Sequence, residues 1–194
     1  MRTYDLAWTT HDGPVSWAQR GRITELGHAD LPEGELARRA PTPCPFTDAE
    51  QVLSFDAVKE YGLPDMGQLI TFYESFYQTG QRSRNMVYPG GYYKTIVSGA
   101  IQSFGWDMLL LAAADQDRFE KVLDSFFRLS LHHYRAWSKT SIEVFISHDD
   151  MVWTMGPIIH PDFYRRVIFP RYQELWSVLR NAGKKVLFCS DGNW

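Results

Sequence analysis

Residues 142–150 read IEVFISHDD, and residues 185–194 read KVLFCSDGNW. Each stretch begins with a mostly apolar run typical of a buried β-strand and continues into acidic and metal-capable side chains. A long helical pattern lies between them. A strand, a helix and a second strand in that order form a βαβ unit, whose two strands run parallel and end on the same side of the sheet. We therefore expect the polar side chains of both strand ends to meet at the edge where α/β enzymes carry their active sites.

The composition is typical of a soluble globular protein. The chain has 194 residues, of which 44% are hydrophobic and 22% charged, which suits one ordinary domain. Its net charge of −3 gives no global field that favours nucleic acid or an anionic membrane. The sequence has no signal peptide, no run of 18 apolar residues and no zinc-finger spacing of its two cysteines, Cys44 and Cys189. We predict a cytoplasmic protein that binds neither nucleic acid nor membrane.

Helical patterns alternate with short strand patterns along the chain. Residues 1–46 look irregular apart from strand-like segments at 4–8 and 15–17. A capping box at 47–50 predicts a helix to about residue 61. The other expected elements are helices at 65–79, 92–104, 107–114 and from Asp115 or Asp117 to 139, a short strand at 85–88 broken by a Pro-Gly-Gly turn at 89–91, and a helix that starts at Pro161, is kinked or divided at Pro170 and ends near 181. This order predicts an α/β fold with a parallel sheet.

The loop after the first strand carries three candidate catalytic residues, His148, Asp149 and Asp150. Adjacent carboxylates repel one another, so one of them is expected to bind a cation, accept hydrogen bonds or keep a raised pKa suited to general acid catalysis. The structural alternative is that Asp149 or Asp150 accepts hydrogen bonds from loop amides or from a helix N-terminus.

The end of the second strand carries Cys189 and Asp191. A thiolate and a carboxylate two residues apart can both face the same side and bind a metal. Two ligands are fewer than a site needs, so the others would come from elsewhere in the chain. The alternative is a buried cysteine followed by an Asp-Gly-Asn turn. Asp191 is also a candidate catalytic residue.

Further motifs accompany these strand ends. They are Ser-His-Asp-Asp at 147–150, Gly-Pro at 156–157, Pro-Asp-Phe-Tyr at 161–164, Pro-Arg-Tyr at 170–172 and Asp-Gly-Asn at 191–193. In combination they resemble the uroporphyrinogen decarboxylase superfamily. Weaker similarity at 43–46 and 95–99 extends the resemblance over most of the chain, so residues 1–194 are interpreted as one domain.

The resemblance implies a (β/α)₈ TIM barrel and one of two chemistries. The first is methyl transfer to or from a corrinoid or a thiol, often assisted by zinc. The second is decarboxylation of porphyrinogen acetate side chains without a cofactor. The implied partners are a small-molecule or tetrapyrrole substrate, a corrinoid protein for methyl transfer, and a second copy of the chain in a homodimer.

Transfer of the family's functional residues is partial. The essential Asp of the decarboxylase corresponds to Asp5, while its pocket Tyr falls on Thr95. The methyltransferase branch has His-x-Cys-Gly-Asn, in which His and Cys bind zinc, and here those two places hold Cys189 and Asp191. The loss of the pocket Tyr favours methyl transfer, with uroporphyrinogen decarboxylase and a non-catalytic remnant as alternatives.

The length predicts an incomplete barrel. A (β/α)₈ barrel needs roughly 200 residues at minimum and typically about 250. The chain offers three or four barrel strands, and we therefore expect flanking strands to be missing.

Overall fold

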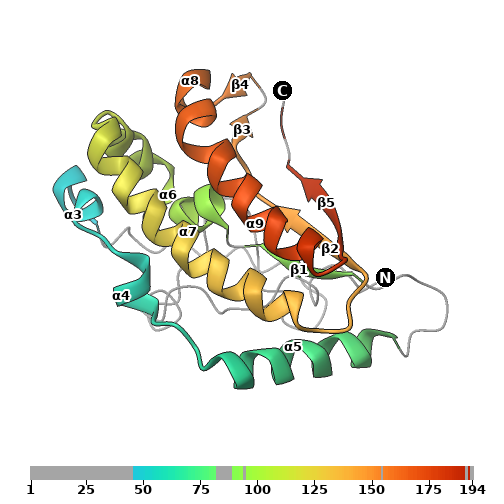
Figure 1. Cartoon of the computed structure of the whole chain (residues 1–194). Coiled ribbons are helices and arrows are strands. Elements are labelled where there is room, and N and C mark those ends of the chain that lie inside the picture. Colours follow the sequence, from blue (N-terminus) through green and yellow to red (C-terminus); the bar gives the residue numbers. More distant parts are fainter. Residues whose placement is uncertain (1–45, 82–88, 94, 154, 191, 193–194) are drawn as a thin grey trace, which may run out of the picture.

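The computed structural model describes residues 46–81, 89–93, 95–153, 155–190 and 192. It shows a mixed α/β structure that is mostly helical and contains a small parallel sheet (Figure 1). The expected α/β class and parallel sheet are confirmed. The described residues contribute three parallel strands, so a closed eight-stranded barrel is not observed among them.

The parallel sheet has the order β1-β2-β5. Its strands are β1 (Gly90–Tyr92), β2 (Val144–His148) and β5 (Lys185–Cys189). The central strand, β2, pairs in parallel with both neighbours. The predicted βαβ unit is therefore present, with β2 and β5 side by side. A separate antiparallel pair, β3 (Val152–Trp153) and β4 (Gly156–Pro157), follows β2 and was not expected from the sequence.

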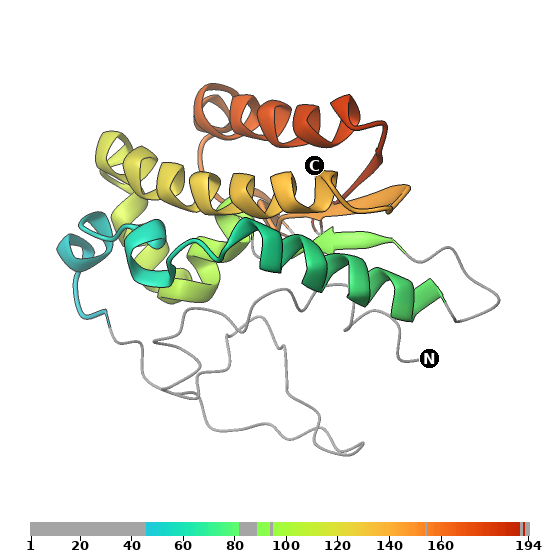
Figure 2. The same ribbon diagram turned by 60° about the horizontal axis from the view of Figure 1, so that its bottom comes forward.

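Helices make up most of the described chain. They are α3 (Ala49–Leu53), α4 (Ala57–Tyr61), α5 (Met66–Gln81), α6 (Ile96–Ala113), α7 (Gln116–Ser138), α8 (Pro161–Phe163), the π-helix η1 (Tyr164–Ile168) and α9 (Phe169–Asn181). The helices α5 and α9 both pack against α7 (Figures 1 and 2).

The helices α7 and α9 cover the same face of the sheet. The Ser147 hydroxyl on β2 is hydrogen-bonded to Tyr134 of α7 at 2.8 Å and accepts a hydrogen bond from Trp176 of α9 at 2.9 Å. Phe145, two residues earlier and therefore on the same face, packs against Tyr134 at a ring distance of 4.8 Å. The face of α7 that carries Tyr134 is therefore part of the core.

The sequence correctly predicts a break at Gly105 inside α6. Gly105 has φ 74° and ψ 169°, which lies outside the helical region and suits a residue without Cβ. By length and composition α6 could cross a membrane, but 61% of that stretch is buried inside the structure, where it packs on α7 and α3. A core helix of a globular domain has these properties.

Two predictions of secondary structure in the N-terminal half of the chain are wrong. The expected helix from 47 to 61 is two short helices, because Asp48 and Asp56 each cap a new start by accepting hydrogen bonds from backbone amides. The expected Pro-Gly-Gly turn contributes Gly90 and Gly91 to strand β1. A Cβ at Gly90 would lie 2.8 Å from Trp137, so glycine is required there for the close packing of α7. The strand expected at 85–88 lies outside the described residues.

The predicted division at Pro170 is confirmed. The backbone widens into the π-helix η1 immediately before it, and α9 starts at Phe169. Proline lacks the N–H of a regular helical hydrogen bond, which accounts for the irregular turn at this position.

Candidate functional site

The C-terminal ends of the three parallel strands form the candidate site. His148 is the last residue of β2 and Cys189 the last residue of β5, and the two are register partners on neighbouring strands. The sequence correctly predicts that these two strand ends lie side by side. Asp5 and Asp191 lie outside the described residues.

Asp149 is fully buried directly after β2. One carboxylate oxygen accepts a hydrogen bond from the Ser98 amide at 2.5 Å, and the other accepts from the Val97 amide at 2.9 Å and from the Tyr172 hydroxyl at 2.6 Å. Burial raises the pKa of Asp149, and these donors act in the opposite direction. Both oxygens of this carboxyl group therefore accept hydrogen bonds from other residues of the protein.

Asp149 caps a helix that starts about fifty residues earlier in the chain. Thr95, the residue before α6, makes no capping hydrogen bond to that helix, while Val97 and Ser98 carry orphan amides of its first turn. A carboxylate at a helix N-terminus also interacts favourably with the helix dipole. The alternative considered from the sequence, in which one of the two aspartates satisfies a helix N-terminus, describes this geometry.

Reciprocal hydrogen bonds tie the same two segments together. The Thr95 hydroxyl donates to the backbone carbonyl of His148, and the Asp150 amide donates to the Ser98 hydroxyl at 2.8 Å. The end of β2 and the start of α6 are therefore joined by side chains from both sides. These hydrogen bonds hold the backbone of residues 148–150 in place where the chain leaves the sheet.

His148 and Asp150 form a close pair beside this buried network. The His148 Nε2 lies 3.2 Å from an Asp150 carboxylate oxygen, and their side chains are 6% and 14% exposed. The ring of Tyr93, which follows β1, stacks on the imidazole with a centroid distance of 4.0 Å and an interplanar angle of 13°. An imidazole oriented by a carboxylate and an aromatic ring is suited to general acid–base chemistry.

Three tyrosines that the sequence analysis did not assign to the site support it. Tyr93 comes from the end of β1, Tyr172 from α9, and Tyr164 from η1, where its hydroxyl donates to the Met151 carbonyl at 2.5 Å. Burial raises the pKa of Tyr172 well above its usual value and that of Tyr164 to about 12. Both hydroxyls are therefore protonated donors at neutral pH. Tyr172 and Tyr164 belong to the Pro-Arg-Tyr and Pro-Asp-Phe-Tyr motifs, which were the signal that could have identified them.

The predicted metal ligand Cys189 is exposed at the surface and is not part of a disulfide bond. Within the part of the chain that the structure describes, no three His, Cys, Asp or Glu side chains are grouped so that they could hold a metal ion. Cys189 and His148 are the two candidate ligands in register. Because a catalytic zinc site uses three protein ligands, the described residues do not complete one.

Comparison of the chain with protein-family models, curated proteins and solved structures found no match. The site is therefore interpreted from its own residues. These combine a buried structural carboxylate, a His–Asp pair with a stacked tyrosine, and an exposed thiol on the neighbouring strand.

Proposed function

We propose that this protein is an enzyme of the uroporphyrinogen decarboxylase superfamily type that transfers a methyl group to or from a corrinoid or a thiol. The observation that carries the proposal is the register pair His148 and Cys189, with Asp150 beside it, at the C-terminal edge of a parallel sheet. This edge is where α/β barrels carry catalytic residues. Most of the motifs that resemble the superfamily follow in the chain from the end of β2, between Ser147 and Tyr172.

The strand arrangement supports a barrel-type sheet. The order β1-β2-β5 follows the order along the chain without a reversal, and α7 and α9 cover one face. A doubly wound sheet reverses its strand order and is covered by helices on both faces, whereas a (β/α)₈ barrel keeps sequential order with all helices outside. We infer that the three strands are consecutive strands of such a barrel.

The proposed role of the His148–Asp150 pair is proton transfer. A thiol that accepts a methyl group must lose its proton, and an imidazole next to a carboxylate can take that proton up. Tyr93 would hold the ring in place by stacking. A corrinoid, when bound, would supply or accept the methyl group.

The proposed role of Cys189 is to contribute a thiolate ligand. Zinc would need further ligands besides Cys189 and His148, and Asp191 is the candidate from the sequence. The described residues alone do not fit a complete zinc site, so we derive no step through the metal.

Uroporphyrinogen decarboxylation is the second candidate. The observation that favours it is the Asp150 carboxylate at the strand edge. In such a reaction a carboxylate would accept hydrogen bonds from pyrrole N–H groups and stabilise the positive charge that develops as carbon dioxide leaves.

Metal content and turnover distinguish these candidates. Stoichiometric zinc in the purified protein, measured by mass spectrometry and lost in Cys189→Ala with an unchanged circular dichroism spectrum, would support methyl transfer. Demethylation of a methylcorrinoid by a thiol should then fall at least tenfold in His148→Gln. Metal-free protein that releases carbon dioxide from a porphyrinogen would instead support the decarboxylase. A folded protein with neither metal nor turnover would refute both and leave a non-catalytic remnant.

A further inference from the structure

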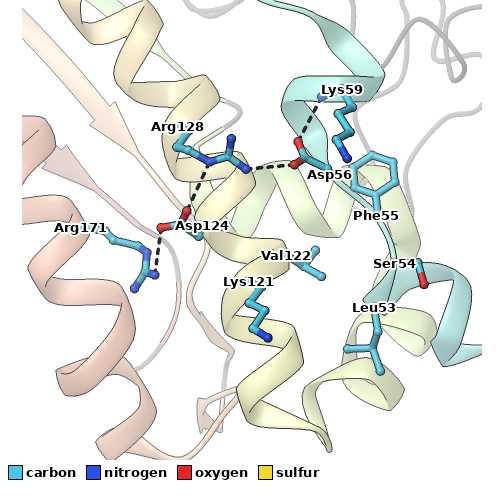
Figure 3. Close-up of a pocket in the computed structure, with 10 residues that line it drawn as sticks. All are labelled: Leu53, Ser54, Phe55, Asp56, Lys59, Lys121, Val122, Asp124, Arg128 and Arg171. Carbon is cyan, nitrogen blue, oxygen red and sulfur yellow. Dashed lines mark hydrogen bonds and ion pairs between the residues drawn. The ribbon is translucent and has the colours of Figure 1, made fainter.

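A pocket with a volume of about 400 Å³ lies among the helices and shares no lining residue with the candidate site (Figure 3). It is lined by the segment that links α3 to α4 and by one side of α7, and Arg171 of α9 closes one end. Leu53, Phe55 and Val122 provide apolar surface. This volume falls within the range of small-molecule sites.

The two acidic side chains of the pocket are neutralised by its two arginines. Asp56 lies 3.0 Å from Arg128, and Asp124 lies 3.3 Å from Arg128 and 3.1 Å from Arg171. Asp56 also caps α4 by accepting from the amides of Val58 and Lys59. Although burial acts in the opposite direction, these hydrogen bonds and Arg128 lower the pKa of Asp56, which therefore stays ionised at neutral pH.

The two lysines of the pocket are not neutralised in this way. Neither Lys59 nor Lys121 makes an ion pair with any residue that the structure describes. Lys59 lies beside the Phe55 ring, and Lys121 lies on α7 across from Leu53 (Figure 3). The pocket therefore combines a net charge of +2 with an apolar wall.

We propose that this pocket binds a small phosphate monoester that carries an apolar group. A phosphate monoester has a charge of about −1.5 to −2 at pH 7, which matches the charge of the two lysines. The Ser54 hydroxyl in the same wall adds a hydrogen-bond donor. The apolar group of the ligand would pack on Phe55 and Leu53.

Ligand-observed NMR and calorimetry with phenyl phosphate test the proposal. We expect phenyl phosphate to bind more tightly than inorganic phosphate, which lacks the ring, and than phenol, which lacks the charge. Each of Lys59→Gln and Lys121→Gln should weaken binding by about twofold to fivefold, because exposed ion pairs contribute modestly. The matched control is Lys185→Gln on β5, outside the pocket, which should leave binding unchanged.

The dependence on salt provides a second test on the unmodified protein. Binding of phenyl phosphate should weaken as ionic strength rises from about 0.05 to 0.5 M, because exposed charges are screened. Equal binding to wild type and to the Lys59→Gln/Lys121→Gln double variant would overturn the proposal. Equal affinity for phenyl phosphate and inorganic phosphate would also overturn it, since the apolar wall would then contribute nothing. Absence of binding at about 10 mM ligand would do the same.

Discussion

The contact between Asp149 and Tyr172 gives the sharpest prediction about stability. Asp149→Asn keeps the size of the side chain but replaces one accepting oxygen with a donor that faces other donors. A buried hydrogen-bonding group left unsatisfied costs about 1–3 kcal/mol, and at least one of the three donors loses its acceptor. We expect Asp149→Asn to lower the free energy of unfolding by about 2–3 kcal/mol.

Tyr172→Phe removes the hydroxyl that donates to the same carboxylate at 2.6 Å. Hydrogen bonds to charged groups contribute about 1.5–3 kcal/mol, so a loss of about 2 kcal/mol is expected from this change alone. Because both substitutions change the hydrogen bonds of the same buried carboxyl group, the double variant should be more stable than the sum of the two losses predicts. We expect a coupling of about 1 kcal/mol.

Urea unfolding followed by circular dichroism measures these values. The midpoint should shift while the slope with denaturant stays constant, which separates a change in stability from a change in the denatured state. Tyr164→Phe is a matched control, because it also removes a buried tyrosine hydroxyl but one that donates to Met151. Its coupling with Asp149→Asn should be smaller than that of Tyr172→Phe, because Tyr164 makes no hydrogen bond to the carboxyl group. Additivity of Asp149→Asn with Tyr172→Phe to within about 0.3 kcal/mol would refute the reasoning.

Three further results are expected. Burial raises the pKa of Asp149 above its value in the unfolded chain, so the stabilisation linked to its protonation should be lost as pH rises from about 4 through the folded pKa. The free energy of unfolding of Asp149→Asn should lack this dependence on pH. A wild-type free energy of unfolding that rises with pH relative to that of the variant would contradict the prediction. Gly90→Ala should cost about 1–3 kcal/mol in urea unfolding, because its Cβ would lie 2.8 Å from Trp137, and Gly67→Ala on α5, whose nearest neighbour would lie 3.3 Å away, should cost less; equal losses would contradict this. Cys189 should react with a maleimide in the folded protein, with peptide mapping of Cys189→Ser as control, and labelling only in urea would contradict its exposure.

The parallel sheet could be predicted because its signals are local. The apolar runs of β2 and β5 differ clearly in period from the helix between them, and the cap at Asp115 marks the start of α7. The same reasoning separated the two halves of α6 at Gly105, since a glycine within an apolar helical pattern allows a non-helical backbone.

The errors in the fold come from contacts between distant residues and from competing local caps. Nothing near Gly90 in the sequence indicates that the indole of Trp137 packs directly against its backbone, so the Pro-Gly-Gly stretch resembles a turn. Thr47 and Asp48 are both good capping residues, and Asp48 makes the cap by accepting from the Gln51 amide at 3.0 Å. A second cap at Asp56 then divides the expected helix.

The neighbouring ends of β2 and β5 could be predicted from the sequence, whereas the different environments of Asp149 and Asp150 could not. Asp149 and Asp150 are adjacent in sequence, and repulsion between neighbouring carboxylates indicates only that their environments must differ. The partners that decide between them, Val97 and Ser98, lie about fifty residues away in the chain. Neither the hydrophobic periodicity nor the spacing of motifs along the sequence indicates such a contact.

Asp149 has a structural role, which distinguishes it from Asp150 at the same strand end. A carboxylate that accepts from two helix amides and a tyrosine has its oxygens engaged by the fold, so its removal should lower stability before it changes any reaction. The Asp150 amide donates to the Ser98 hydroxyl, and the Asp150 carboxylate lies 3.2 Å from the His148 Nε2. Asp150→Asn keeps the backbone amide that donates to Ser98, so it should shift the urea midpoint less than Asp149→Asn does.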